Sequence, residues 1–130
     1  MRKKGGRMNK KMLTVDDSPS VRKLVKFTLK AKGYEVSSAG DGLEALDLLK
    51  QEVFDAIILD INMPRMNGLE FLSAIKADDR YAGMPVIMLT TEGQDDDKDK
   101  AVALGATAYM VKPFKPTQLL MLLEKILPST

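Results

Sequence analysis

Short apolar stretches alternate along the chain with longer stretches in which apolar residues recur every three or four positions. The short stretches are typical of strands buried on both faces, and the periodic ones are typical of amphipathic helices. The predicted strands, in chain order, are residues 11–15, 34–39, 56–60, 85–90 and 108–111. Five strands that each precede a helix predict an α/β fold with a doubly wound five-stranded parallel sheet and five helices on its two faces.

Residues that favour helix starts and stops separate these strands from the helices. Ser18-Pro19-Ser20 has the composition of a helix start, and Asp41 and Asn67 each precede a glutamate by three positions, as in a capping box. The acidic run at 95–97 would favour the start of the fourth helix through the helix macrodipole. Pro128 would end the fifth helix.

Acidic residues stand where two of the predicted strands end. Asp16 and Asp17 follow the first strand, and Asp60 ends the third. In open parallel sheets ligands bind outside the carboxyl ends of the strands, at the point where the strand order reverses. A reversal near the first strand would bring the ends of the first and third strands together, so we expect the three carboxylates to face one pocket.

Three carboxylates in one pocket repel one another and require a cation. A hard ion that keeps some of its water ligands, such as Mg²⁺, fits a site with one or two direct carboxylates. Thr90 at the end of the fourth strand adds a hydroxyl, and Lys112 after the fifth adds an ammonium. A carboxylate nucleophile with Mg²⁺, a hydroxyl and a lysine suits phosphoryl transfer.

Each of these residues also has an ordinary structural explanation. Asp16 and Asp17 could only cap the following helix, and Asp60 could begin a turn. Thr90 could be a common strand residue, and Lys112 a solvated loop lysine. The recurrence of such groups at the ends of several strands favours the site interpretation.

Composition narrows the class of protein. The chain has 130 residues, of which 45% are hydrophobic, with no cysteine and no apolar run near 18 residues. This length fits one domain with its own core, and the hydropathy argues against a membrane span. We therefore expect a soluble protein without disulfides, located in the reducing cytoplasm.

The positive charge is concentrated at the amino terminus. Six of the 20 lysines and arginines lie in the first 11 residues, and the remainder carries a net charge of −4. This basic head lacks aromatic residues, an apolar signal core and a recognition helix. We expect residues 1–10 to be a disordered basic extension, residues 11–128 to be the folded domain, and DNA not to be a partner.

Four motifs occur in order at the ends of the predicted strands: Asp16-Asp17; Ile57-Ile58-Leu59-Asp60 with Met63-Pro64 and Asn67-Gly68 behind it; Val86 to Thr90; and Gly105 to Phe114. Together they make residues 11–128 resemble the receiver domain of two-component response regulators. Within that family the chain is most similar to the stand-alone chemotaxis regulators. The resemblance implies the flavodoxin-like strand order 2-1-3-4-5.

The resemblance also implies the roles of the acidic residues. Asp60 would be the phospho-acceptor, taking a phosphoryl group from a sensor histidine kinase. Asp17, Asp60 and the backbone carbonyl of Asn62 would bind Mg²⁺ directly, and Asp16 would act through a bound water. The protein would then be a switch that catalyses only its own phosphorylation and dephosphorylation.

Further residues would transmit the signal if the resemblance holds. Thr90 and Lys112 would contact the phosphoryl oxygens, and Tyr109 would be an aromatic rotamer switch. The downstream partner would bind a surface made by the fourth helix, the fifth strand and the fifth helix. Asn62 and Glu92 would flank the path of the attacking water and give relatively fast self-dephosphorylation, with a phosphatase as a further partner. The Lys112-Pro113 peptide would be cis.

Other functions are also compatible with this sequence. Within the switch class, the chain could serve chemotaxis, act as a phosphorelay intermediate or regulate a target unrelated to motility. A flavodoxin-like cofactor binder would need a phosphate-cradling loop after the first strand, where Asp16-Asp17 would repel a phosphate. An aspartyl phosphatase is a third reading, although the residue two positions after Asp60 is Asn62 and not a second acid.

Overall fold

The computed structural model describes residues 10–91 and 95–127. The strands are β1 (Lys11–Val15), β2 (Glu35–Ala39), β3 (Ala56–Asp60), β4 (Val86–Thr91) and β5 (Ala108–Lys112). The helices are α1 (Pro19–Ala31), α2 (Gly42–Gln51), α3 (Gly68–Lys76), α4 (Asp95–Ala103) and α5 (Pro116–Ile126). Apart from Lys10, the expected basic extension lies outside the described residues, as does Glu92.

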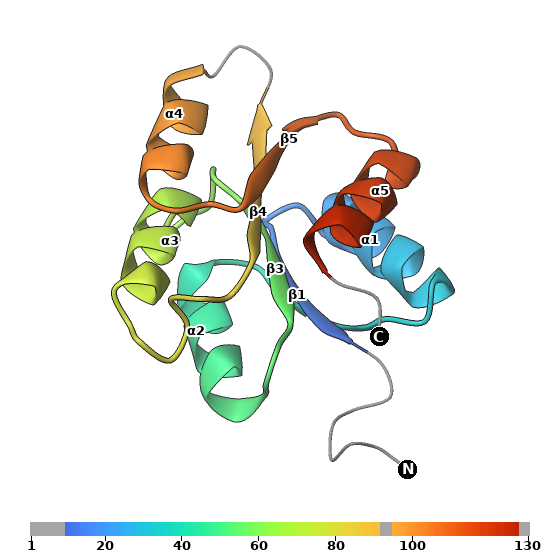
Figure 1. Ribbon diagram of the computed structural model, residues 1–130, viewed down its shortest axis with the longest axis horizontal. Helices are drawn as coiled ribbons and strands as arrows, with labels where there is room; N and C mark the ends of the chain where they lie inside the picture. The colour runs from blue at the N-terminus through green and yellow to red at the C-terminus, as the bar shows by residue number, and fades with distance from the viewer. Residues whose placement is uncertain (1–9, 92–94, 128–130) are drawn as a thin grey trace.

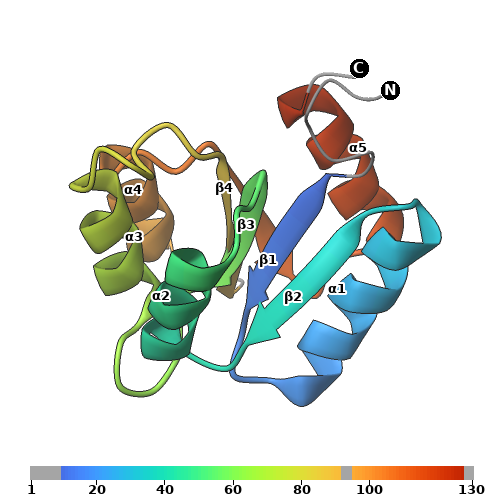
Figure 2. The ribbon, with the colours of Figure 1, turned by 90° about the horizontal axis from the view of Figure 1, so that it is seen from below.

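The five strands form one parallel sheet in the order β2-β1-β3-β4-β5. Helices α1 and α5 cover one face of the sheet, and α2, α3 and α4 cover the other (Figures 1 and 2). The predicted fold class and strand order are therefore confirmed. No helix within the described ranges is long and apolar enough to cross a membrane.

The sheet separates two hydrophobic cores. Along β3, Ile57 and Leu59 pack into the core under α2, α3 and α4, whereas Ala56 and Ile58 pack into the core under α1 and α5. All five residues of β3 are buried, including the terminal Asp60. This double burial explains why the central strands are continuous apolar runs without alternation.

Side-chain caps begin the helices where the sequence predicts them. The Ser18 hydroxyl accepts a hydrogen bond from the Val21 N–H at 3.3 Å at the start of α1, and Asn67 forms a reciprocal capping box with Glu70 at the start of α3. At α2 only half of the predicted capping box forms. The Asp41 side chain accepts a hydrogen bond from the Glu44 N–H and so caps the helix, but the Glu44 side chain accepts from the Gly40 N–H and not from the Asp41 N–H.

The last two strands extend slightly beyond their predicted ends. Thr91 pairs with Lys112 in the β4–β5 ladder, so both residues belong to the sheet. As a result, Lys112 is held by strand geometry and not by a loop. The Lys112-Pro113 peptide that follows is cis, as expected.

Candidate functional site

The strand order brings three carboxylates together at the carboxyl ends of β1 and β3. Val15 and Leu59 are paired across these two strands, so the residues that follow them are neighbours. One carboxylate oxygen from each of Asp16, Asp17 and Asp60 lies within 4.8 Å of the others. Asp16 and Asp60 are buried, and Asp17 is exposed. The pocket is therefore open to solvent on the Asp17 side.

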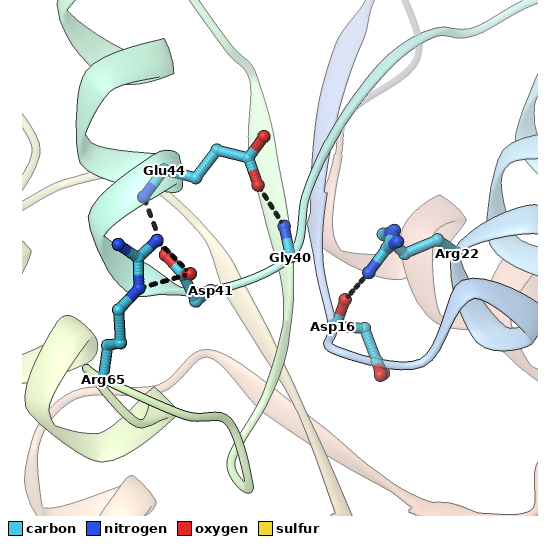
Figure 3. A network of polar contacts seen from close by, with 6 residues as sticks. All are labelled: Asp16, Arg22, Gly40, Asp41, Glu44 and Arg65. Atoms are coloured by element: carbon cyan, nitrogen blue, oxygen red, sulfur yellow. Dashed lines mark hydrogen bonds and ion pairs between the residues drawn. The ribbon is translucent and has the colours of Figure 1, made fainter.

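Asp16 is fixed by its own backbone and by α1. Its Oδ1 accepts a hydrogen bond from the Ser18 N–H at 2.9 Å, and its carbonyl accepts one from the Arg22 guanidinium (Figure 3). Its buried Oδ2 is paired with the Lys112 ammonium, 3.0 Å away, and accepts no hydrogen bond from another described residue. This oxygen has capacity left for a further ligand.

Lys112 bridges two of the three acids. Its Nζ lies 3.0 Å from Oδ2 of Asp16 and 3.1 Å from Oδ1 of Asp60. Burial by itself would lower the pKa of Lys112, but the hydrogen bonds and charges of the two aspartates outweigh burial and raise it. Lys112 is therefore a cation at neutral pH, and it faces two buried carboxylates.

Asp60 is held in an environment that disfavours its charged form. Burial, followed by the negative charge of Asp16, raises the pKa of Asp60 from 3.8 to about 6, although Lys112 opposes the shift. The negative charge of Asp17 also raises the pKa of Asp60, by a smaller amount. With three carboxylates and one lysine, the ionised pocket therefore carries an excess of negative charge. Hard carboxylate oxygens, an Asp16 Oδ2 whose contact is the Lys112 ammonium, and a solvent-facing acid together fit a divalent cation such as Mg²⁺.

Thr90 lies near the carboxyl end of β4, and Tyr109 lies on the neighbouring strand β5. The buried Thr90 hydroxyl donates to the Met110 carbonyl at 3.3 Å, so in this structure its hydrogen bond points toward β5. The Tyr109 side chain is turned outward and is 37% exposed. The Lys98 ammonium of α4 lies 4.3 Å from the centre of the Tyr109 ring, a cation–π contact.

Two arginines in the elements around the pocket were not predicted from the sequence. Arg22 of α1 binds the Asp16 carbonyl, and Arg65, between β3 and α3, binds the side chain of Asp41 (Figure 3). The hydrogen bond from the Glu44 N–H and those from Arg65 lower the pKa of Asp41, despite some burial. The only feature of the sequence that could have indicated either contact is the position of Arg65 inside the predicted turn from Pro64 to Gly68.

Comparisons with known proteins agree with this geometry. A family model described as the response regulator receiver domain matches residues 12–124. Over 119 residues the chain is 44% identical to a chemotaxis protein CheY homolog of Campylobacter jejuni, covering 90% of this chain and 92% of that protein. It is also 42% identical over 120 residues to the probable transcriptional regulator ycf27 of Guillardia theta, covering 92% of this chain but 46% of that protein.

Solved structures give the same answer. The chain resembles the chemotaxis response regulator CheY4 of Vibrio cholerae with a TM-score of 0.86 and 46% identity, covering 92% of this chain and all of that one. The resemblance seen in the sequence motifs is thus confirmed by the family match, by curated relatives and by the fold. The chain belongs to the response regulator receiver domains, which are signalling switches.

Proposed function

We propose that this receiver is switched by transfer of a phosphoryl group to Asp60 from the phosphorylated histidine of a sensor kinase. One observation supports this most strongly: Asp60 is a buried carboxylate at the end of a central strand, within 4.8 Å of two further acids and 3.1 Å from a lysine. Such a carboxylate is costly to keep unless it serves chemistry.

In the proposed reaction an oxygen of the Asp60 carboxylate attacks the phosphorus atom of the phosphohistidine. The new P–O bond forms as the P–N bond breaks, and the electron pair of the P–N bond stays on the imidazole nitrogen. The Lys112 ammonium, already 3.1 Å from Asp60, would neutralise charge on the transferred group. The pKa of about 6 leaves Asp60 mostly ionised, and therefore nucleophilic, at neutral pH.

The acidic residues would hold a Mg²⁺ ion in this reaction. Asp17, Asp60 and the Asn62 backbone carbonyl are the proposed direct ligands, and Asp16 would act through a water. When bound, the ion neutralises phosphoryl and carboxylate oxygens, as in other phosphoryl transfers. Asp16, held by Ser18 and Lys112, would orient that water with its remaining oxygen capacity.

The signal would leave the pocket through β4 and β5. A phosphoryl group on Asp60 adds acceptor oxygens, for which the Thr90 hydroxyl would exchange its bond to the Met110 carbonyl. Movement of Thr90 would let Tyr109 turn inward from under Lys98. The surface of α4, β5 and α5 would then change shape, and a partner protein would bind the phosphorylated arrangement.

Chemotaxis is the proposed setting, because the Campylobacter and Vibrio relatives carry chemotaxis names and match most of this chain. The switch would act in the cytoplasm and be reset by self-dephosphorylation tuned by Asn62 and Glu92, with a phosphatase as an added route. A second candidate is the control of another output, since the Guillardia transcriptional regulator is 42% identical.

Intact-mass analysis after incubation with Mg²⁺ and acetyl phosphate tests the proposal. Wild type is expected to gain the mass of one phosphoryl group, and Asp60→Asn is expected to gain none. Asp55→Asn, which changes an aspartate just before the same strand, is the matched control and should still be modified. An adduct on Asp60→Asn, or no adduct on wild type with and without Mg²⁺, would contradict the proposal.

A further inference from the structure

The connection between β3 and α3, residues 61–67, bends sharply at Arg65. This residue has a φ of 66°, and the Met66 N–H donates to the Pro64 carbonyl at 2.8 Å. The three residues thus form a γ-turn with a positive φ at its centre, which is a strained conformation for a long side chain. Glycine or asparagine would adopt it more readily. Contacts outside the turn must therefore stabilise it.

Those contacts come from the start of α2. The Arg65 Nε donates to Oδ2 of Asp41 at 2.9 Å, and Nη2 of the same guanidinium contacts the same oxygen (Figure 3). The other oxygen of Asp41 accepts from the Glu44 N–H and so caps α2. The Gly42 N–H also donates to the Met66 carbonyl at 3.4 Å. One buried aspartate therefore holds both the helix start and the turn.

The other end of the connection closes on the acidic pocket. The Gly68 N–H donates to the Ile61 carbonyl at 2.8 Å, and a Cβ placed on Gly68 would lie 2.1 Å from the Asp60 carbonyl oxygen. Asn62 lies inside this short closed loop. The position of its backbone therefore depends on where Arg65 is held.

We propose that Arg65 and Asp41 are a positioning pair that fixes the β3–α3 connection, and with it the Asn62 backbone carbonyl, for binding of Mg²⁺ beside Asp60. The inference rests on the proposed function, because the Asn62 carbonyl is a ligand only if the pocket holds the ion. Both side chains act through the loop, since their hydrogen bonds join α2 to the turn.

The direction of the effect separates positioning from simple electrostatics. If charge alone mattered, Arg65→Ala would strengthen Mg²⁺ binding by removing a positive charge, and Asp41→Asn would weaken it. Positioning predicts that both substitutions weaken binding, by about tenfold, the lower end of the effect of outer-shell partners. Asp41→Asn keeps an oxygen that can cap α2, so the helix start is preserved.

The test is an NMR titration of the full chain with MgCl₂, in which backbone amide shifts give the Kd. The variants are Arg65→Ala, Asp41→Asn, their combination and Arg65→Gly. Each single loss is expected to weaken binding about tenfold, and the double variant should be no weaker than the weaker single variant. Arg65→Gly should bind more tightly than Arg65→Ala, because glycine accepts the positive φ.

Arg80→Ala is the matched control, because it breaks an exposed arginine–aspartate pair with Asp78 in the α3–β4 connection. Its Kd should equal that of wild type. Urea unfolding of every variant supplies a second measurement. A loss of unfolding free energy with an unchanged Kd would assign the Arg65 pair a structural role only and overturn the inference.

Three other results would overturn it as well: single variants that shift the Kd in opposite directions, additive losses in the double variant, or Arg65→Gly binding more weakly than Arg65→Ala. If wild type binds Mg²⁺ and is phosphorylated, and the variants have the same Kd as wild type, the positioning role of Arg65 and Asp41 is rejected and the proposed function stands. A wild type that neither binds Mg²⁺ nor accepts a phosphoryl group would reject both.

Discussion

Two carboxylates near opposite ends of the sheet each lie against a lysine, and their pKa values shift in opposite directions. Near the amino ends of the strands, Glu52 pairs with Lys11 and accepts a hydrogen bond from the Ser37 hydroxyl at 3.0 Å. These contacts, led by Lys11, lower the pKa of Glu52 despite some burial. At the carboxyl ends, Asp60 pairs with Lys112, yet its pKa rises to about 6.

Burial and a neighbouring charge of the same sign explain this difference. Asp60 is 3% exposed and has Asp16 beside it, whereas Glu52 is partly solvated. The charges of Glu52 and Lys11 balance each other, and this pair favours the folded state. The carboxyl-end cluster consists of Asp16, Asp17, Asp60 and Lys112. Its negative charges outnumber its positive charge unless a further cation binds, so it lowers the free energy of unfolding while it provides a binding site.

Removing the Lys112 ammonium from the carboxyl-end cluster should have the largest effect on the free energy of unfolding. Lys112→Ala leaves two buried carboxylates unpaired, which is expected to lower the free energy of unfolding by about 3 kcal/mol at pH 8. At pH 5 the loss should be smaller, because Asp60 is then protonated in the folded state. Urea unfolding at the two pH values measures this, with Lys112→Arg as the charge-preserving control. An equal loss at pH 5 and pH 8 would contradict the account.

Removing the Asp60 charge should instead stabilise the metal-free protein. The folded pKa of about 6 lies above the ordinary 3.8, so ionisation of Asp60 destabilises the fold at high pH. The full pKa shift corresponds to about 3 kcal/mol at pH 8. Asp60→Asn is expected to raise the free energy of unfolding by about 2 kcal/mol, because the amide also weakens the contact with Lys112. The gain should shrink as the pH falls through 6 and disappear below about 3.8. A destabilised variant at pH 8 in EDTA would reject this explanation.

Added Mg²⁺ should complete the cluster. At a concentration ten times its Kd, the ion is expected to stabilise wild type by about 1.4 kcal/mol. Asp60→Asn should lose most of this gain, because a direct carboxylate ligand is gone. Thermal unfolding with and without Mg²⁺ gives both values. A buffer with EDTA, free of divalent metals, provides the metal-free reference. Equal stabilisation of the two proteins would place the ion elsewhere.

The Glu52 pair should give the smallest effect, with the opposite sign to Asp60→Asn. Glu52→Gln is expected to lower the free energy of unfolding by about 0.5 kcal/mol at pH 7, since solvent screens a partly exposed pair. The lowered pKa means that this contribution exists above the ordinary value of 4.5 and fades as the pH falls through the folded value. Urea unfolding at pH 7 and pH 3 tests the sign. If Glu52→Gln is more stable than wild type at pH 7, Glu52 and Asp60 do not differ in the way described.

The fold could be predicted from the sequence because each element carries its own local signal. The five-residue run of β3 is apolar up to Asp60, and Ser18 and Asn67 cap the helices that follow β1 and β3. Parallel crossovers then leave few ways to arrange the strands. The meeting of Asp16 with Asp60 follows from that arrangement alone, so these site residues could be proposed without coordinates.

The side-chain contacts could not be predicted in the same way. That Lys112 touches both Asp16 and Asp60 depends on one added ladder pair at the end of β5. The Arg65 contact with Asp41 depends on a positive φ that no propensity favours in an arginine. Such contacts join residues distant in sequence, and their geometry comes from packing and not from local preference.

The pKa of Asp60 tests most directly whether the cluster of Asp16, Asp17, Asp60 and Lys112 needs a cation in addition to Lys112. Carbon-detected NMR of the aspartate side chains, titrated in metal-free buffer and again with saturating Mg²⁺, measures it. We expect a pKa of about 6 without metal and a markedly lower value with Mg²⁺, because the ion favours the carboxylate. A metal-free pKa at or below the ordinary 3.8, unchanged by Mg²⁺, would contradict the account.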